Sequence, residues 1–213
     1  MNTIYKKQRL IEIKNEIGIG TYLLGRLKML QYKKIQKEYG INIWHITPIE
    51  LRPYAMHIVS ELNELFETDM SIKGCVEIGC GLGDIIRNIN TPKKYGYDIS
   101  ADVINAAKYI DKKHTTEYFV GSFQDVNSIL FDNIVLVAVN FIHNIDADTL
   151  KQSFSCVTQS KHISYIVIDS VEGKDYRYHH DYKYILPNYE LLKQIYSKNG
   201  REVLLLAKIK NEE

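Results

Sequence analysis

An α/β fold with a doubly wound, mostly parallel sheet and helices on both faces is predicted by three observations. Strand-like apolar runs alternate with helical patterns from residue 75 onward, and this alternation is typical of a parallel sheet. The run 134–139 is apolar throughout, as in a strand that is buried on both faces. The run 75–78 passes directly into three glycines at alternate positions. That pattern predicts a strand that feeds a tight turn.

Length and composition indicate one domain. The 213 residues divide into a helical N-terminal cap over 1–70 and an α/β part over 71–213. A net charge of +1 gives no electrostatic reason to expect nucleic acid. No apolar run approaches the roughly 20 residues that span a bilayer, and the N-terminus lacks the apolar core of a signal peptide. The three cysteines are expected to be reduced thiols, so we expect a cytoplasmic protein.

Two helices are predicted in the cap. Residues 19–39 have an amphipathic pattern, and we interpret the helix as packed on its apolar residues with a solvated basic face. The apolar residues are Leu23, Leu24, Leu27, Leu30 and Ile35, and the basic ones are Arg26, Lys28, Lys33, Lys34 and Lys37. A second helix is predicted to begin at Thr47, because Thr47 to Glu50 reads as a capping box with Pro48 at the first helical position.

The most informative stretch is 73–100. Its glycines, Gly79, Gly81 and Gly83, follow the acid Glu77 and precede a predicted helix over 84–89, so we expect a ligand over the turn at a helix N-terminus. A second strand, 95–97, ends in Asp98, whose carboxylate is placed to accept both hydroxyls of a ribose. A dinucleotide fingerprint would carry its last glycine where this chain has an aspartate, at position 84. A nicotinamide-dependent dehydrogenase is therefore disfavoured.

These residues resemble the class I S-adenosylmethionine-dependent methyltransferases. Glu77 to Gly83 is similar to their first motif, [DE]-x-G-x-G-x-G, and Asp98 to their second-strand acid. The resemblance implies a Rossmann-like domain over 71–213, S-adenosylmethionine as cofactor and S-adenosylhomocysteine as product. It assigns cofactor binding to Glu77, Gly79, Gly81, Gly83, Asp98, Ile99, Ser122, Phe123 and Asn140. Ser122 departs from the family, which commonly has an acid there to hold the adenine amino group; Ser122 or the backbone beside Phe123 is expected to replace it.

The remaining elements follow in order. Helices are predicted over 101–110, 146–157 and 187–199, the last closed by Gly200, and strands over 115–120, 163–168 and 203–209. The family's sheet ends in a hairpin of strands, whereas only one strand fits after Gly200. The sequence therefore predicts a shortened or rearranged sheet edge.

Catalytic residues are sought beyond the carboxyl ends of the strands, where ligands of open parallel sheets lie. Methyl transfer to an alcohol needs alignment, exclusion of water and removal of a proton. Histidine suits the last task, so His143 is the first choice of base and His180 the second, with Asp169 or Asp181 to orient the ring. The segment 171–186 is crowded with polar rings, and together with the cap it is expected to hold the substrate through Trp44, His45, Arg52, Tyr178, His179 and Asp181.

The wider pattern resembles small bacterial methyltransferases of surface-sugar and polar-metabolite modification. It implies a small polar acceptor, an oxygen of a sugar, nucleotide-linked sugar or phosphoryl-bearing group in capsule or lipopolysaccharide biosynthesis, and a monomer or homodimer. Two alternatives remain open. One is a non-catalytic S-adenosylmethionine-binding module. The other is a metal-assisted O-methyltransferase, although magnesium prefers more carboxylates than Asn140, His143, Asp169 and His180 offer.

Overall fold

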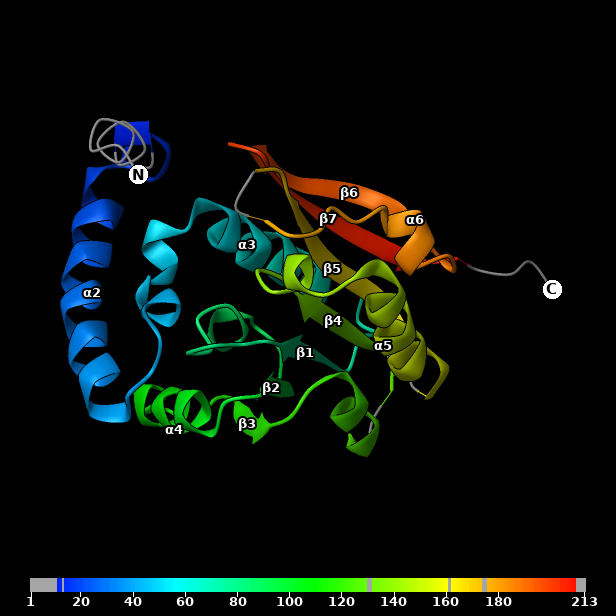
Figure 1. Ribbon diagram of the computed structural model, residues 1–213, viewed down its shortest axis with the longest axis horizontal. Helices are drawn as coiled ribbons and strands as arrows, with labels where there is room; N and C mark the ends of the chain where they lie inside the picture. Colours follow the sequence, from blue (N-terminus) through cyan, green and yellow to red (C-terminus); the bar gives the residue numbers. More distant parts are fainter. Residues whose placement is uncertain (1–10, 13, 130–131, 161, 174–175, 210–213) are drawn as a thin grey trace.

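The computed structural model describes residues 11–12, 14–129, 132–160, 162–173 and 176–209 (Figure 1). One seven-stranded sheet crosses the molecule in the order β3-β2-β1-β4-β5-β7-β6. Strands β1 to β5 pair in parallel, and β7 runs antiparallel to both of its neighbours, β5 and β6. The strands are β1 (Gly74–Ile78), β2 (Lys94–Asp98), β3 (Glu117–Val120), β4 (Ile134–Ala138), β5 (Ile163–Val171), β6 (Tyr189–Lys198) and β7 (Arg201–Lys208). The predicted α/β class is confirmed.

Burial on both faces of the central strands comes from the alternation of side chains. In β4, Ile134, Leu136 and Ala138 join the core on one face of the sheet, while Val135 and Val137 join the core on the other. Because successive side chains of a strand point to opposite faces, a continuous apolar run is what a strand needs when both faces are covered.

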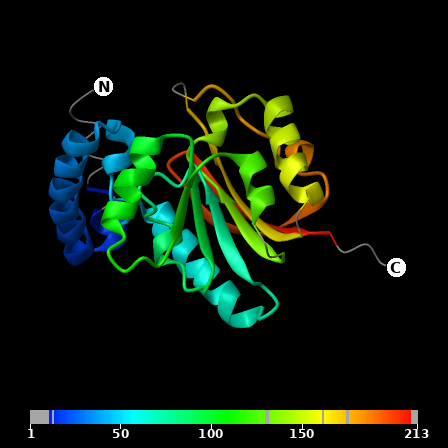
Figure 2. The same cartoon turned by 90° about the horizontal axis from the view of Figure 1, so that it is seen from below.

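Helices cover these two faces. α5 (Ala147–Ser160) packs Leu150, Phe154 and Val157 on the first. α3 (Pro53–Thr68) and α4 (Ala101–Ile110) pack on the second, and Figure 2 shows α3 and α5 on opposite sides of the sheet. The short helix α6 (Tyr182–Ile185) precedes β6. α2 (Ile19–Tyr39) lies at the edge of the molecule, outside α4 and the 3-10 turns η1 (Ile43–Ile46) and η2 (Ile49–Leu51) (Figure 1).

The prediction of a helix over 187–199 is wrong, and so is the prediction of a shortened or rearranged sheet edge. This segment is the edge strand β6, which pairs along β7. The two-residue connection Asn199-Gly200 has positive φ at both positions, 55° and 72°, as a type I′ hairpin turn requires. Gly200 closes a hairpin, not a helix, and the sheet edge is complete.

Two predicted helix starts also differ. The glycine turn is followed only by the 3-10 turn η3 (Ile86–Asn88), so the ligand over this turn has no helix N-terminus beneath it. The second cap helix begins at Pro53 rather than Thr47, and no side chain caps η2. Proline is tolerated in the first turn of a helix but not in its interior, so a helix from Thr47 would have placed Pro53 where it breaks the helix.

The inward face of α2 differs most from the prediction. Gly25, Tyr32 and Ile35 are buried, whereas Leu23, Leu24, Leu27 and Leu30 are exposed. Gly25 permits close packing, because a Cβ there would lie 2.7 Å from Leu51. In the part of the chain that the structure describes, no helix is both long and apolar enough to cross a membrane.

Candidate functional site

The glycine turn begins where β1 ends, next to the point where the strand order reverses between β1 and β4. Gly79 and Gly83 both have positive φ, 66° and 74°, a region that disfavours side chains with a Cβ. A Cβ at Gly79 would lie 2.5 Å from the Phe141 ring, and one at Gly83 would overlap the Tyr118 hydroxyl. The turn therefore needs glycine for its backbone and its packing alike.

Asp98 joins the second strand to this turn. Its Oδ2 accepts a hydrogen bond from the Gly81 N–H at 3.1 Å, and its Oδ1 accepts one from the Ser100 N–H at 3.0 Å. A carboxylate has about four acceptor positions, so two remain for the hydroxyls of a diol. Ile99, the next residue, is 81% exposed, which leaves an apolar surface beside the carboxylate.

Glu77 lies beneath the turn rather than on it. The side chain is buried, and its Oε2 accepts a hydrogen bond from the Ile86 N–H at 3.0 Å. Burial raises the pKa of this carboxyl from 4.5 to about 8, against the opposing effects of that N–H and of the nearby Arg52. We interpret Glu77 as the residue that holds the turn in shape.

A pH prediction follows from Glu77. Because its pKa is higher in the folded than in the unfolded chain, its stabilising contribution is complete below about pH 4.5 and is lost as the pH rises through about 8. Replacing Glu77 by Gln is expected to remove this dependence, which for one proton is at most about 1.4 kcal/mol per pH unit. Urea unfolding of both proteins across this range measures it. Parallel pH profiles for the two proteins would contradict the assignment.

Asp84 ties the cap to the turn. Its Oδ1 accepts hydrogen bonds from the Tyr32 hydroxyl and the Arg87 guanidinium, both at 2.6 Å, and its Oδ2 accepts one from Arg52 at 2.9 Å. Tyr32 comes from α2 and Arg52 from the start of α3. This role of Asp84 was not predicted from the sequence. The charge of Arg52, predicted to face substrate, is paired here with a buried carboxylate.

Other cap residues lie closer to the turn. The His45 Nδ1 would be 3.2 Å from a Cβ at Gly81, so this imidazole lies against the glycine turn. Burial lowers the pKa of His45. Trp44 is 80% exposed. Ser122 forms a capping box with Asp125 at the start of η4 (Phe123–Ser128), and the Phe123 ring is buried against Phe154. The Ser122 hydroxyl and the Phe123 ring are therefore both engaged within the protein.

A second polar cluster lies at the ends of β4 and β5. Asn140 Oδ1 accepts hydrogen bonds from the Tyr54 hydroxyl at 2.7 Å and from Arg201 at 2.9 Å, and its N–H donates to Asp169 at 2.9 Å. Arg201 also forms an ion pair with Asp169, whose side chain is fully buried. Burial raises the pKa of Asp169, and Arg201 opposes the rise.

Arg201 was not predicted as a site residue, because its position depends on the hairpin of β6 and β7, and the sequence analysis predicted a helix there. β7 is antiparallel, so its first residue lies opposite Val171 at the carboxyl end of β5. The signal that would have found it is the pair Asn199-Gly200, which is a strong hairpin indicator. Tyr54 was missed because its helix was predicted to begin six residues earlier.

His143 is buried in the turn η5 (Ile142–Asn144) beside this cluster. Its ring meets Tyr176 edge-on at 4.6 Å between centroids, and its Nδ1 has no hydrogen-bond partner among the described residues. Burial, with Arg201 and His180 nearby, lowers its pKa to about 4. The imidazole is therefore neutral near pH 7 and able to accept a proton.

The polar-ring segment closes over His143. The Tyr178 N–H donates to the His143 carbonyl at 3.1 Å, and His180 Nε2 lies 3.0 Å from the Ile142 carbonyl. A carbonyl only accepts, so His180 carries its proton on Nε2, and its buried Nδ1 has no partner in the part of the chain that the structure describes. His179 and Asp181 are exposed.

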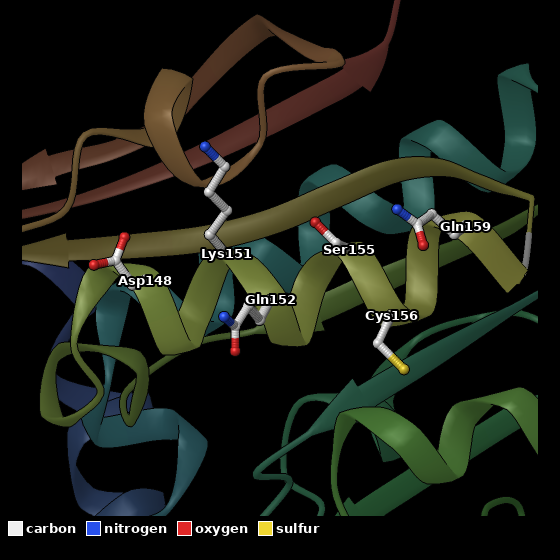
Figure 3. Close-up of a pocket in the computed structure, with 6 residues that line it drawn as sticks. All are labelled: Asp148, Lys151, Gln152, Ser155, Cys156 and Gln159. Carbon is white, nitrogen blue, oxygen red and sulfur yellow. The ribbon is translucent and has the colours of Figure 1, made fainter.

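The structure does not support carboxylate orientation of either histidine. Asp181 accepts from the Lys183 N–H and caps α6, and Asp169 pairs with Arg201. Among the described residues, no three side chains of His, Cys, Asp and Glu converge as they would around a metal ion. The surface hollow in Figure 3 is separate from this site, since it is lined only by residues of α5: Asp148, Lys151, Gln152, Ser155, Cys156 and Gln159.

Comparison with known proteins shows the fold. No family model matches the chain, and no curated protein matches its sequence. Magnesium protoporphyrin IX methyltransferase from Synechocystis PCC 6803, solved with bound S-adenosylmethionine, is 11% identical and has a TM-score of 0.60 over 89% of this chain and 97% of that one. The bacterial methyltransferase domain CtHen1-CN is 12% identical, with a TM-score of 0.56 over 72% of this chain and 99% of that one.

The bifunctional kinase-methyltransferase WbdD is also similar. It is 13% identical, with a TM-score of 0.54 over 71% of this chain. The match covers only 38% of the WbdD chain. Because the identities are so low, these structural similarities show only that the chain shares the fold of these methyltransferases.

Proposed function

We propose that this chain, which has the fold of the class I S-adenosylmethionine-dependent methyltransferases, transfers a methyl group from that cofactor to an oxygen of a small polar acceptor. The observation that carries the proposal is the meeting of two strand ends. Asp98 at the end of β2 accepts a hydrogen bond from the Gly81 N–H in the glycine turn after β1. This is the point where ligands of doubly wound sheets bind.

The residues present fit the cofactor. Asp98 retains acceptor positions for the ribose hydroxyls, the turn from Gly79 to Gly83 lies beside it, and the exposed Ile99 offers a surface for the adenine ring. The backbone beside Ser122 is the candidate partner of the adenine amino group, and Asn140 is expected near the methyl-bearing end. When bound, the cofactor supplies an electrophilic methyl group whose leaving group is a neutral thioether.

The acceptor site is assigned to the ends of β4 and β5. His143 and His180 each have a buried ring nitrogen there that forms no hydrogen bond with a described residue. Arg52 and Arg201 are both paired with buried carboxylates, which favours an uncharged hydroxyl over a phosphoryl oxygen. We therefore propose a sugar or nucleotide-linked sugar, as in surface-glycan synthesis. Arg177 and Lys183 are exposed within the segment 171–186 and are the candidates for a phosphoryl group, while Lys174 lies outside the described residues.

Replacing His143 by Ala is expected to lower turnover by about 10²-fold and to leave cofactor affinity near that of the parent. General bases contribute about 10²–10⁴-fold, and a pKa of about 4 makes His143 a weak base at the low end of that range. Single-turnover rates with the identified acceptor measure the effect. His162→Ala is the matched control, since His162 is exposed before β5. Unchanged turnover in His143→Ala with a loss in His180→Ala would move the role to His180.

Two alternatives have their own tests. A metal-assisted reaction predicts loss of turnover in excess chelator, whereas the pairing of Asp169 with Arg201 leads us to expect full activity. A non-catalytic binding module predicts cofactor binding without turnover on any acceptor.

The acceptor class is tested with S-adenosylmethionine that carries a labelled methyl group. The protein is incubated with it and a cell extract, and the label is sorted into small polar metabolites, glycans, RNA and protein. Label in the first two fractions supports the proposal. Label in RNA or protein would keep the methyltransferase and overturn the acceptor, and no label despite cofactor binding would favour the binding module.

A further inference from the structure

The outward face of α2 carries an apolar stripe that nothing in the described chain covers. Ile19, Leu23, Leu27 and Leu30 are 61%, 55%, 65% and 59% exposed. Their spacing of four, four and three residues places them along one side of the helix. Figures 1 and 2 both show α2 at the outer edge of the molecule, with the body on one side only. Contiguous exposed apolar residues of this kind mark interaction sites.

Basic residues surround the stripe. Arg26 and Lys33 lie three positions after Leu23 and Leu30, and Lys34 and Lys37 continue its line toward the C-terminal end of the helix. All four are exposed, and none forms an ion pair with another described residue. α2 contains five basic residues and one acid, Glu38, and only Lys28 is paired, with Glu50.

This combination restricts the occupant. A second copy that packed stripe on stripe would bring two sets of four unpaired cations together, and like charges across an interface are unfavourable. A surface that complements α2 must present apolar groups to the stripe and anionic groups to the basic residues. A bilayer interface with acidic phospholipids has this layering.

We propose that α2 lies flat on an anionic lipid surface as a peripheral contact. Ile19, Leu23, Leu27 and Leu30 enter the boundary between headgroups and acyl chains, and the basic residues lie against lipid phosphates. The opposite face of α2 is fixed to the glycine turn through the bond between Tyr32 and Asp84. The contact would therefore hold the proposed cofactor site within about one helix diameter, roughly 10 Å, of the membrane surface.

Co-sedimentation of the full chain with phosphatidylcholine vesicles, with and without phosphatidylglycerol, tests the proposal. Binding is expected only to the anionic vesicles and is expected to weaken with salt. Each basic residue near such a surface contributes about fivefold, so Lys33→Gln/Lys34→Gln should weaken binding by roughly 25-fold. Lys73→Gln/Lys93→Gln removes the same charge from exposed positions elsewhere and should have little effect.

The contribution of the apolar stripe to binding is tested separately. Leu23→Gln/Leu27→Gln should abolish most binding, whereas Leu191→Gln/Leu192→Gln, at two exposed positions of the edge strand β6, should not. All four variants change exposed residues, and thermal unfolding checks that they fold. Absence of binding to anionic vesicles, or equal losses in test and control variants, would overturn the proposal. So would a dimer in light scattering that Leu23→Gln/Leu27→Gln dissociates, since the stripe would then be an interface between copies.

Discussion

Replacing Asp98 by Ala is expected to weaken binding of S-adenosylmethionine by about 10²–10⁴-fold. The carboxylate can accept both ribose hydroxyls while it retains the Gly81 and Ser100 N–H groups. Hydrogen bonds to a charged group contribute about 1.5–3 kcal/mol each, and about 1.4 kcal/mol is a factor of ten in affinity. Asp98→Asn keeps one acceptor oxygen, so its affinity should lie between those of the parent and of Asp98→Ala.

Calorimetric titration with S-adenosylhomocysteine measures this loss without turnover. Asp102→Ala is the matched control, because Asp102 is an exposed acid in the first turn of α4, four residues further on. Removal of Asp98 also frees two backbone N–H groups, so unfolding curves must show that the variant is folded. An affinity close to that of the parent, or an equal loss in the control, would remove Asp98 from its assigned role and weaken the proposed function.

Replacing Arg201 by Ala is expected to reduce the free energy of unfolding by about 3–5 kcal/mol, the range for breaking a buried ion pair from one side. The Asp169 side chain is fully buried and would lose its cation, and Asn140 would lose a donor. Because burial raises the pKa of Asp169 and the variant lacks the opposing charge, its carboxylate should protonate more readily. The difference from the parent should therefore shrink as the pH falls through that pKa.

Urea unfolding at several pH values measures this effect. The double variant Asp169→Asn/Arg201→Met should be more stable than Arg201→Ala, since neither charge is then left alone. Lys193→Ala breaks the exposed pair with Glu61 and is expected to leave stability near that of the parent. Similar losses from the exposed and the buried pair would show that the cluster at Asn140 does not depend on Arg201.

The turn and the acid of the proposed cofactor site could be predicted to lie together because the pattern that places them is local. Three glycines at alternate positions after an apolar run specify a strand and an open turn. An acid at the end of the next strand lies beside that turn once two parallel strands pair. The structure places Asp98 within hydrogen-bond distance of Gly81, as this reasoning requires.

The acceptor half could be predicted only in part. His143 and His180 do come together, but the carboxylates expected to orient them bond elsewhere, Asp181 to the backbone of α6 and Asp169 to Arg201. Arg201 reaches the site because β6 and β7 form a hairpin. β6 is rich in Leu, Lys and Gln, which favour helices intrinsically, and only its pairing along β7 makes it a strand.

The sequence by itself determined the α/β class, the central parallel strands and the turn that the cofactor needs, because glycine conformation and apolar alternation act over a few residues. Only the tertiary structure decided which face of α2 turns inward and which residues complete the acceptor site. α2 has apolar side chains on both sides, so its pattern cannot select a face. Gly25 against Leu51 and Tyr32 on Asp84 make the choice, and both contacts join residues that are distant in the chain.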